Sequence, residues 1–262
     1  MNWLVDWIYN NPSWLWGSVF VGASVIGACV GLLVFDRAVG KSWRKTHNDV
    51  TGIMVQLIGV VYAVLLAFIA VATWETLSSS TNVVQQEAGY VDNLYRDSQG
   101  FPEDFARTVR QLVREYADTV IKTEWPEQRS GDTPTDGWQP LDRLHLQLVT
   151  FRPANQGEAV VQAEFLRALN ELYQARTARL TAVSGHVPTV IWWIIVLGGA
   201  LAVGSTFFFG FQKLWVHLVL VGLFSASLML VIVMIVALDW PFRGEVSVPA
   251  DAYINVERGW EG

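Results

Sequence analysis

The sequence has one cysteine and few charged residues, and these shortages exclude several classes of protein. Cys29 lies inside an apolar run, so the chain can form neither an internal disulfide nor a cysteine metal site. The net charge is −6 and the 18 lysines and arginines are scattered, so the sequence lacks the basic stripe typical of nucleic-acid-binding proteins. No Lys or Arg precedes the first apolar run, so we expect that run to be retained rather than removed as a secretory signal.

Four long stretches contain no Asp, Glu, Lys or Arg at all. Each reaches the length of about 20 apolar residues that a membrane-spanning helix needs. Backbone groups in lipid must be satisfied within the segment, and runs this continuous do not suit the alternating strands of a barrel. The sequence therefore predicts an all-α integral membrane protein with four transmembrane helices, at Trp14–Phe35, Gly52–Thr73, Val190–Phe209 and Val216–Leu238.

A polar segment separates the second and third predicted spans. The sequence therefore predicts a first transmembrane hairpin at 1–74, a helical extramembrane domain at 75–186, and a second transmembrane hairpin with the C-terminal tail at 187–262. Helical periodicity continues without a break from the second span to Tyr95, which predicts a rigid stalk. A second helix begins after Pro102 and is expected to end at Trp125-Pro126. We expect a surface loop at 127–140, a short helix at 141–150, and a last helix that ends at Gly185 to Pro188.

Positive charges near the spans predict the orientation. The first connection holds Arg37, Lys41, Arg44 and Lys45, and the connection between the last two spans holds Lys213. The positive-inside rule then places both short connections in the cytoplasm. Both termini and the helical domain of this multi-pass cell-membrane protein are accordingly expected on the non-cytoplasmic side.

The second span carries a stripe of small residues with a single amide. These residues recur at helical spacing on one face: Gly52, Gln56, Gly59, Ala63, Ala67 and Ala70. Such a stripe either lets two helices pack closely or lines a narrow pathway. We keep both readings, with Gln56, Gly59, Ala63, Ala67 and Ala70 as candidate pore-lining residues.

Three charged residues flank the membrane on the helices of the extramembrane domain. Glu87 lies on the helix that leaves the second span, and Arg176 and Arg179 lie on the helix that approaches the third. If these helices are antiparallel neighbours, Glu87 can form a structural ion pair with the two arginines. Alternatively, the two arginines form an electropositive collar at a pore mouth.

The sequence gives no sign of catalytic or cofactor chemistry. It contains no Gly-rich phosphate loop, no Ser-His-Asp arrangement and no metal-ligand spacing, so we expect neither an enzyme nor a cofactor or metal site. The four histidines are too dispersed to ligate one haem iron. Apart from His217 near one end, the spans contain no ionisable side chain of the kind that proton-driven transporters use.

Four sequence stretches occur in a recognisable order: QEAGYVDNLYR from Gln86, EYADTVIKTEWP from Glu115, ARTARL from Ala175 and LDWPFRGEVSV from Leu238. In these the chain resembles the bestrophin-like domain proteins, a family of membrane proteins of undefined function, from about the second span to Tyr253. Trp240 departs from the basic residue expected in the family's turn. The resemblance implies kinship with anion channels and four spans around a helical insert, and it supplies no ion-binding residue.

Together these patterns predict a homo-oligomeric channel. Four helices with so few polar residues leave no aqueous path inside one subunit, so the pore must form between subunits. The family resemblance implies that the permeant ion is an anion. The expected partners are the lipid bilayer, further copies of the chain and a small inorganic ion, with no nucleic acid. The alternative is a membrane scaffold or sensor whose helical domain binds a partner or ligand without conduction.

Overall fold

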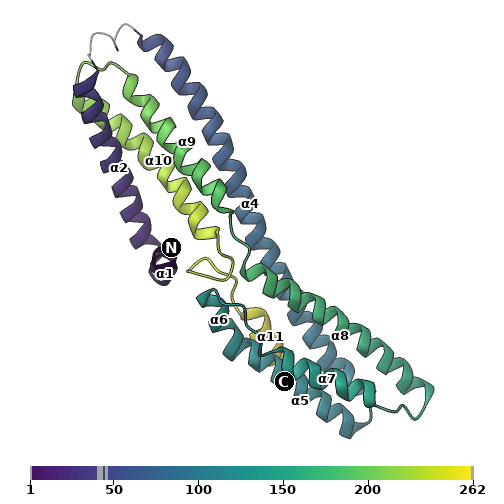
Figure 1. Ribbon diagram of the computed structural model, residues 1–262. Coiled ribbons are helices and arrows are strands. Elements are labelled where there is room, and N and C mark those ends of the chain that lie inside the picture. The colour runs from purple at the N-terminus through teal and green to yellow at the C-terminus, as the bar shows by residue number, and fades with distance from the viewer. Residues whose placement is uncertain (1, 40–43, 45–46, 261–262) are drawn as a thin grey trace. The chain divides into compact units, whose positions relative to one another are not determined.

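The computed structural model (Figure 1) describes residues 2–39, 44 and 47–260, and every regular element among them is helical. Contacts divide the chain into two compact units, Met1–Glu75 with His186–Asp239 and Thr76–Gly185 with Trp240–Gly262. Four helices are long and apolar enough to cross a membrane. The predicted all-α class with four spans is thereby confirmed.

The first unit contains these apolar helices. They are α2 (Ser13–Ala38), the first half of α4 (Asn48–Asp97), α9 (Thr189–Ser205) and α10 (Leu214–Leu238), and the short α1 (Asn2–Asn10) precedes them. The third span was expected to remain α-helical to Phe209, but α9 gives way to the 3-10 turn η3 (Thr206–Phe208). The hydroxyls of Ser205 and Thr206 donate to the carbonyls of Ala202 and Val203, and such local bonds compete with the α-helical ladder.

Several helix pairs hold the first unit together, and α9 contacts both α10 and α2. The most extensive contact is between α2 and α10, where the Oγ atoms of Ser24 and Ser225 lie 2.6 Å apart. Between α4 and α9, the Tyr62 hydroxyl donates to the Ile195 carbonyl at 2.7 Å. In Figure 1 these four helices run side by side. Their outer surfaces remain apolar and exposed, as lipid contact requires.

A buried polar cluster closes the ends of α2, α9 and α10. Arg44 is 1% exposed, pairs with Asp36 and donates to the Phe207 carbonyl at 3.3 Å. The His217 ring nitrogen lies 2.9 Å from the Thr206 carbonyl. Arg37 is exposed, whereas Lys41 and Lys45, two charges used to predict the orientation, lie outside the described residues.

The second unit is a helical bundle. It contains the second half of α4, the 3-10 turn η1 (Ser98–Gly100), α5 (Glu103–Thr119), α6 (Trp125–Ser130), α7 (Trp138–Thr150), α8 (Gln156–Val183) and α11 (Asp251–Gly259). The helix α4 continues without a break to Asp97, as the periodicity predicted, whereas the rigidity of the stalk stays a prediction. Residues 240–262, which the sequence analysis assigned to the second hairpin, group here, and Phe242, Val248 and Tyr253 are part of the bundle's core.

The helix predicted to end at Trp125-Pro126 instead continues to Ser130. A π-helical turn, η2 (Val120–Glu124), joins α5 to α6. Pro126 has no N–H to donate and its ring crowds the preceding turn, and the wider π turn accommodates both. The expected loop at 127–140 is therefore shorter, because Gly131, at φ 91°, ends α6 and α7 begins at Trp138.

Candidate functional site

The small-residue stripe of α4 is largely uncovered within one subunit. Gln56, Ala63 and Ala67 are exposed and Gly59 is half-buried. A Cβ added at Gly59 would meet no atom within 4 Å. Ala70 differs, because it packs against the apolar core of the first unit. Among the described residues, the part of the stripe from Gln56 to Ala67 therefore brings no other helix close to α4.

A different face of α4 makes the intramolecular contact. Tyr62, Leu66 and Ile69 are buried against α9. The small residues that permit this approach lie on α9, because a Cβ at Gly198 would fall 2.7 Å from Cε2 of Tyr62 and one at Gly199 would fall 2.9 Å from its hydroxyl. Sequence reasoning missed this contact, although the Gly198-Gly199 pair in an apolar helix is the usual signal of close helix packing.

Gln56 is the one amide on the exposed surface of this span. The described residues offer it no hydrogen-bond partner, and its neighbours Ile53 and Val60 are 66% and 56% exposed. Placing an amide in hydrocarbon without a partner costs roughly 2–7 kcal/mol, depending on the reference state. The geometry therefore favours water or another polar group beside Gln56 over lipid.

The second unit contains a buried network of four charged side chains, which we call the charge network: Glu87, Glu124, Arg176 and Arg179. All four are 0% exposed. Arg176 binds both carboxylate oxygens of Glu124, at 2.8 and 2.5 Å. Arg179 binds Glu87 at 2.5 and 3.2 Å and also reaches Glu124 at 2.8 Å.

Neutral groups add further hydrogen bonds around these charges, although the buried Nε atom of Arg176 and the Nε2 atom of Gln128 have no partner among the described residues. The Tyr116 hydroxyl donates to Glu87, the Gly137 N–H donates to Glu124 at 2.7 Å, and Arg179 donates to the Gln128 side chain at 2.7 Å. The π turn helps to place Glu124, which is its last residue. Two positive and two negative charges leave the charge network neutral, and a neutral network is the arrangement that buried charges require.

Glu124 and the two arginines keep their charges near neutral pH. Burial by itself raises the pKa of Glu124, but the hydrogen bond from Arg176 and the charges of Arg179 and Arg176 outweigh it, and they lower the pKa from 4.5 to about 2. Burial opposes the charged form of Arg179 as well, but the charge of Glu87 raises its pKa well above the ordinary value. Burial also raises the pKa of Tyr116. Proton transfer at neutral pH is thus not a role for these groups.

The structure brings the three charged residues singled out in the sequence into one cluster and adds a fourth, Glu124. Glu87 pairs with Arg179, while Arg176 pairs with Glu124, which the sequence did not single out as a site residue. An electropositive collar needs arginines that face solvent, so the 0% exposure of both favours the structural ion pair. One signal was available: all four charged residues lie inside three of the four motifs quoted above.

No metal-binding group emerges from the geometry. Among residues 2–39, 44 and 47–260, no three His, Cys, Asp or Glu side chains are placed to hold a metal ion.

Comparison with known proteins identifies related sequences and folds. The family model for the bestrophin-like domain matches residues 22–253. A variant of a bacterial bestrophin homologue from Klebsiella pneumoniae has a similar crystal structure, with a TM-score of 0.70 at 14% identity, covering 94% of this chain and 99% of that one. A second variant of that homologue gives 0.68 at 13% identity, covering 91% and 96%. No curated protein matches the sequence significantly.

Proposed function

The chain belongs to the bestrophin-like domain family, and from this membership we propose that it is a homo-oligomeric membrane channel for small inorganic ions, in which α4 lines a pore between subunits. The observation that carries the proposal is the uncovered stripe on α4, where Gln56, Ala63 and Ala67 are exposed and Gly59 is half-buried. The chain itself leaves this stripe open, and its amide is poorly suited to lipid.

The packing of the first unit supports a path between subunits rather than within one. The side chains between α4, α9 and α10 are buried and apolar, and they include Tyr62, Ile195 and Ile235. Between α2 and α10, Leu32 and Val221 are likewise buried. No polar lining connects the two ends of this bundle among its described residues. A closed ring of copies, the usual symmetry of homo-oligomers, supplies the missing enclosure.

The proposed permeant ion is an anion, on the strength of the family's name alone. Bilayer recording of the purified protein in asymmetric chloride tests this choice. A reversal potential near the chloride equilibrium value supports anion conduction, and one near the cation value overturns it. If no current appears in either salt, the scaffold or sensor alternative replaces the channel.

One substitution separates a pore from a packed interface between subunits. In an open path, Ala63→Trp projects a ring into the pore and blocks flux while the oligomer stays assembled. In a packed interface, the same change overpacks the contact at a cost of about 1–3 kcal/mol and dissociates the oligomer. Flux assays and mass measurement in nanodiscs on the same sample distinguish the two.

Matched controls come from other faces of the same helix. Leu57 and Val61 are 59% and 63% exposed and lie away from the stripe, so Leu57→Trp and Val61→Trp should leave flux unchanged. Val64, 49% exposed, lies seven residues after Leu57 and therefore on the same side of the helix as Leu57. A block by Val64→Trp with normal flux in Ala63→Trp would refute the assignment of the stripe as the pore lining. Detection of monomer alone would remove the channel proposal.

The proposed orientation, with both termini and the helical unit outside, rests on the positive-inside rule. It is tested on a Cys29→Ser background with a single cysteine introduced at Arg152, an exposed residue of the helical unit. A membrane-impermeant maleimide should label Arg152→Cys in intact cells. If Arg152→Cys is labelled only after the cells are opened, the helical unit lies in the cytoplasm and the proposed orientation is wrong.

A further inference from the structure

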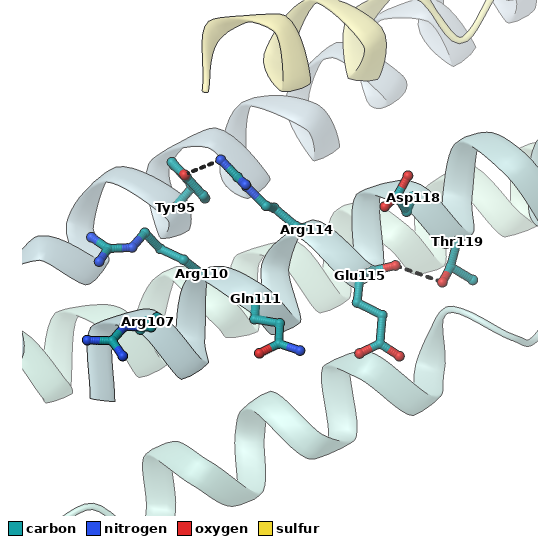
Figure 2. Close-up of a pocket in the computed structure, with 8 residues that line it drawn as sticks. All are labelled: Tyr95, Arg107, Arg110, Gln111, Arg114, Glu115, Asp118 and Thr119. Carbon is teal, nitrogen blue, oxygen red and sulfur yellow. Dashed lines mark hydrogen bonds between the residues drawn. The ribbon is translucent and has the colours of Figure 1, made fainter. Parts of the chain in front are cut away.

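A groove rich in arginine lies on the surface of the second unit. Figure 2 shows its main part, a pocket of about 530 Å³ lined by Tyr95 of α4 and by residues of α5. A second pocket of about 300 Å³ adjoins it and shares Tyr95 and Arg110. We call the two together the arginine groove, after Arg96, Arg107, Arg110 and Arg114 in their lining.

The spacing of three of these arginines places them on one side of α5. Arg107, Arg110 and Arg114 are separated by three and four residues, which are neighbouring positions on a helix surface. An aromatic wall stands beside them, because Tyr95 and Trp260 stack with ring centroids 4.3 Å apart. The Arg114 guanidinium lies 5.1 Å from the Tyr95 ring centre and donates to its hydroxyl at 2.7 Å, as Figure 2 also shows.

The carboxylates that line the groove are already paired with cations that do not line it. Glu115 binds Arg143 of α7, and Asp118 binds Lys122. The lining therefore has a local excess of positive charge, although the whole chain has a net charge of −6.

Three of the four arginines pair with a carboxylate, and Arg96 pairs at 2.9 Å with Asp92, which is 25% exposed. Arg107 pairs at 3.4 Å with Asp104, which is 98% exposed, and Arg110 pairs at 2.9 Å with Glu103, which is 71% exposed. Such solvent-exposed pairs contribute little and exchange readily with other anions. Within the described part of the chain, Arg114 has no carboxylate within ion-pair distance, and it donates only to Tyr95 and to the Trp260 carbonyl.

We propose that the arginine groove is a binding site for a small phosphate-bearing anion, a role separate from ion conduction and not dependent on it. A guanidinium offers a planar fork of donors that fits phosphate and carboxylate oxygens. Several forks on one surface supply more donors than a single carboxylate can accept, whereas a phosphate group brings three acceptor oxygens and close to two negative charges. The groove's volume also lies in the range of small-molecule sites.

The test is isothermal titration of pyrophosphate into the intact protein in zwitterionic nanodiscs at constant ionic strength. We expect saturable binding that weakens at least tenfold in the double variant Arg107→Gln/Arg110→Gln. Arg114 is left intact because it also holds Trp260. The matched control is Arg167→Gln, an exposed arginine of α8 with 72% exposure, which should bind as the wild type does.

Three results overturn the proposal: no saturable binding in the wild type, unchanged binding in a double variant whose thermal melt is normal, or an equal loss in Arg167→Gln. If the double variant melts early, Arg110→Gln alone is measured against the same criteria. Nanodiscs with anionic lipid identify the source of the phosphate. If anionic lipid weakens the apparent affinity for pyrophosphate in the wild type but not in the double variant, a lipid headgroup competes for the arginine groove. If the affinity of the wild type is unchanged, the natural ligand is a soluble anion.

Discussion

Replacing Glu124 by glutamine tests whether the charge network holds the second unit together. The change keeps the shape of the side chain and removes one charge. Glu124 accepts two hydrogen bonds from Arg176, one from Arg179 and one from the Gly137 N–H. In Glu124→Gln the network keeps two guanidinium groups and one carboxylate, so one buried positive charge is uncompensated.

Two routes give the size of the expected effect. Removing one partner of a buried ion pair typically costs about 3–5 kcal/mol. The lowering of the Glu124 pKa from 4.5 to about 2 corresponds to about 3 kcal/mol, since one pKa unit equals about 1.4 kcal/mol. At about 2–4 °C per kcal/mol for a protein of this size, we expect the melting temperature to fall by about 10 °C.

Circular dichroism melts of the protein in detergent measure this change. The matched control is Glu171→Gln on α8, where the carboxylate is 41% exposed and lies 3.7 Å from Arg167. The control should change stability by less than about 0.5 kcal/mol. If Glu124→Gln also stays within about 1 kcal/mol of wild type, less than the pair estimate, the charge network contributes little and the reasoning is wrong.

A double variant isolates the pairing from the loss of the side chain. Arg176→Gln should cost less in the Glu124→Gln background than in the wild type, because there it removes the uncompensated charge. The coupling energy should reach about 2 kcal/mol, within the range for residues in one network. Strictly additive effects would show that Arg176 and Glu124 act independently.

The lowered pKa also predicts how stability depends on pH. A carboxyl whose pKa is lower in the folded than in the unfolded state contributes its full stabilisation above the unfolded value, here about 4.5. That contribution is lost as the pH falls through the folded value of about 2. The difference in stability between wild type and Glu124→Gln should therefore shrink between these two pH values. A constant difference would contradict the assignment to Glu124.

The remaining predictions concern the contact between α4 and α9. Gly198→Ala should destabilise the first unit by about 1–3 kcal/mol through overpacking, because its Cβ would lie 2.7 Å from Cε2 of Tyr62. The control Gly204→Ala, on the same helix with no atom within 4 Å of its added Cβ, should be neutral or slightly stabilising in the same melt, and equal effects of the two would refute the contact. Tyr62→Phe removes the 2.7 Å hydrogen bond to the Ile195 carbonyl and should cost about 1 kcal/mol, whereas an unchanged melt would show that this bond contributes nothing.

The second unit shows how far sequence periodicity can predict a water-facing bundle. The helix predicted to begin after Pro102 has apolar residues at helical spacing, and two of these on α5, Val109 and Tyr116, are at most 1% exposed. The same reasoning failed at Trp125-Pro126, because it treats proline as a helix end and has no representation of a π turn. It also could not select the partner of Arg176, since Glu124 lies 52 residues away in sequence and its pairing depends on that turn.

The membrane unit shows why the candidate pore face stays a prediction. In water, the buried face of a helix is apolar and the exposed face is polar, so the sequence distinguishes them. In lipid both faces are apolar, and only residue size and isolated polar groups carry a signal. That signal picked the small residues of α4, yet the chain buries the neighbouring face with Tyr62 and Leu66 and leaves Gln56 and Ala63 exposed. Within the described part of the chain, a helix–helix contact is therefore not the reason for the residue types at these two positions. We propose either a second subunit packed against them or a pore, and Ala63→Trp separates these two proposals.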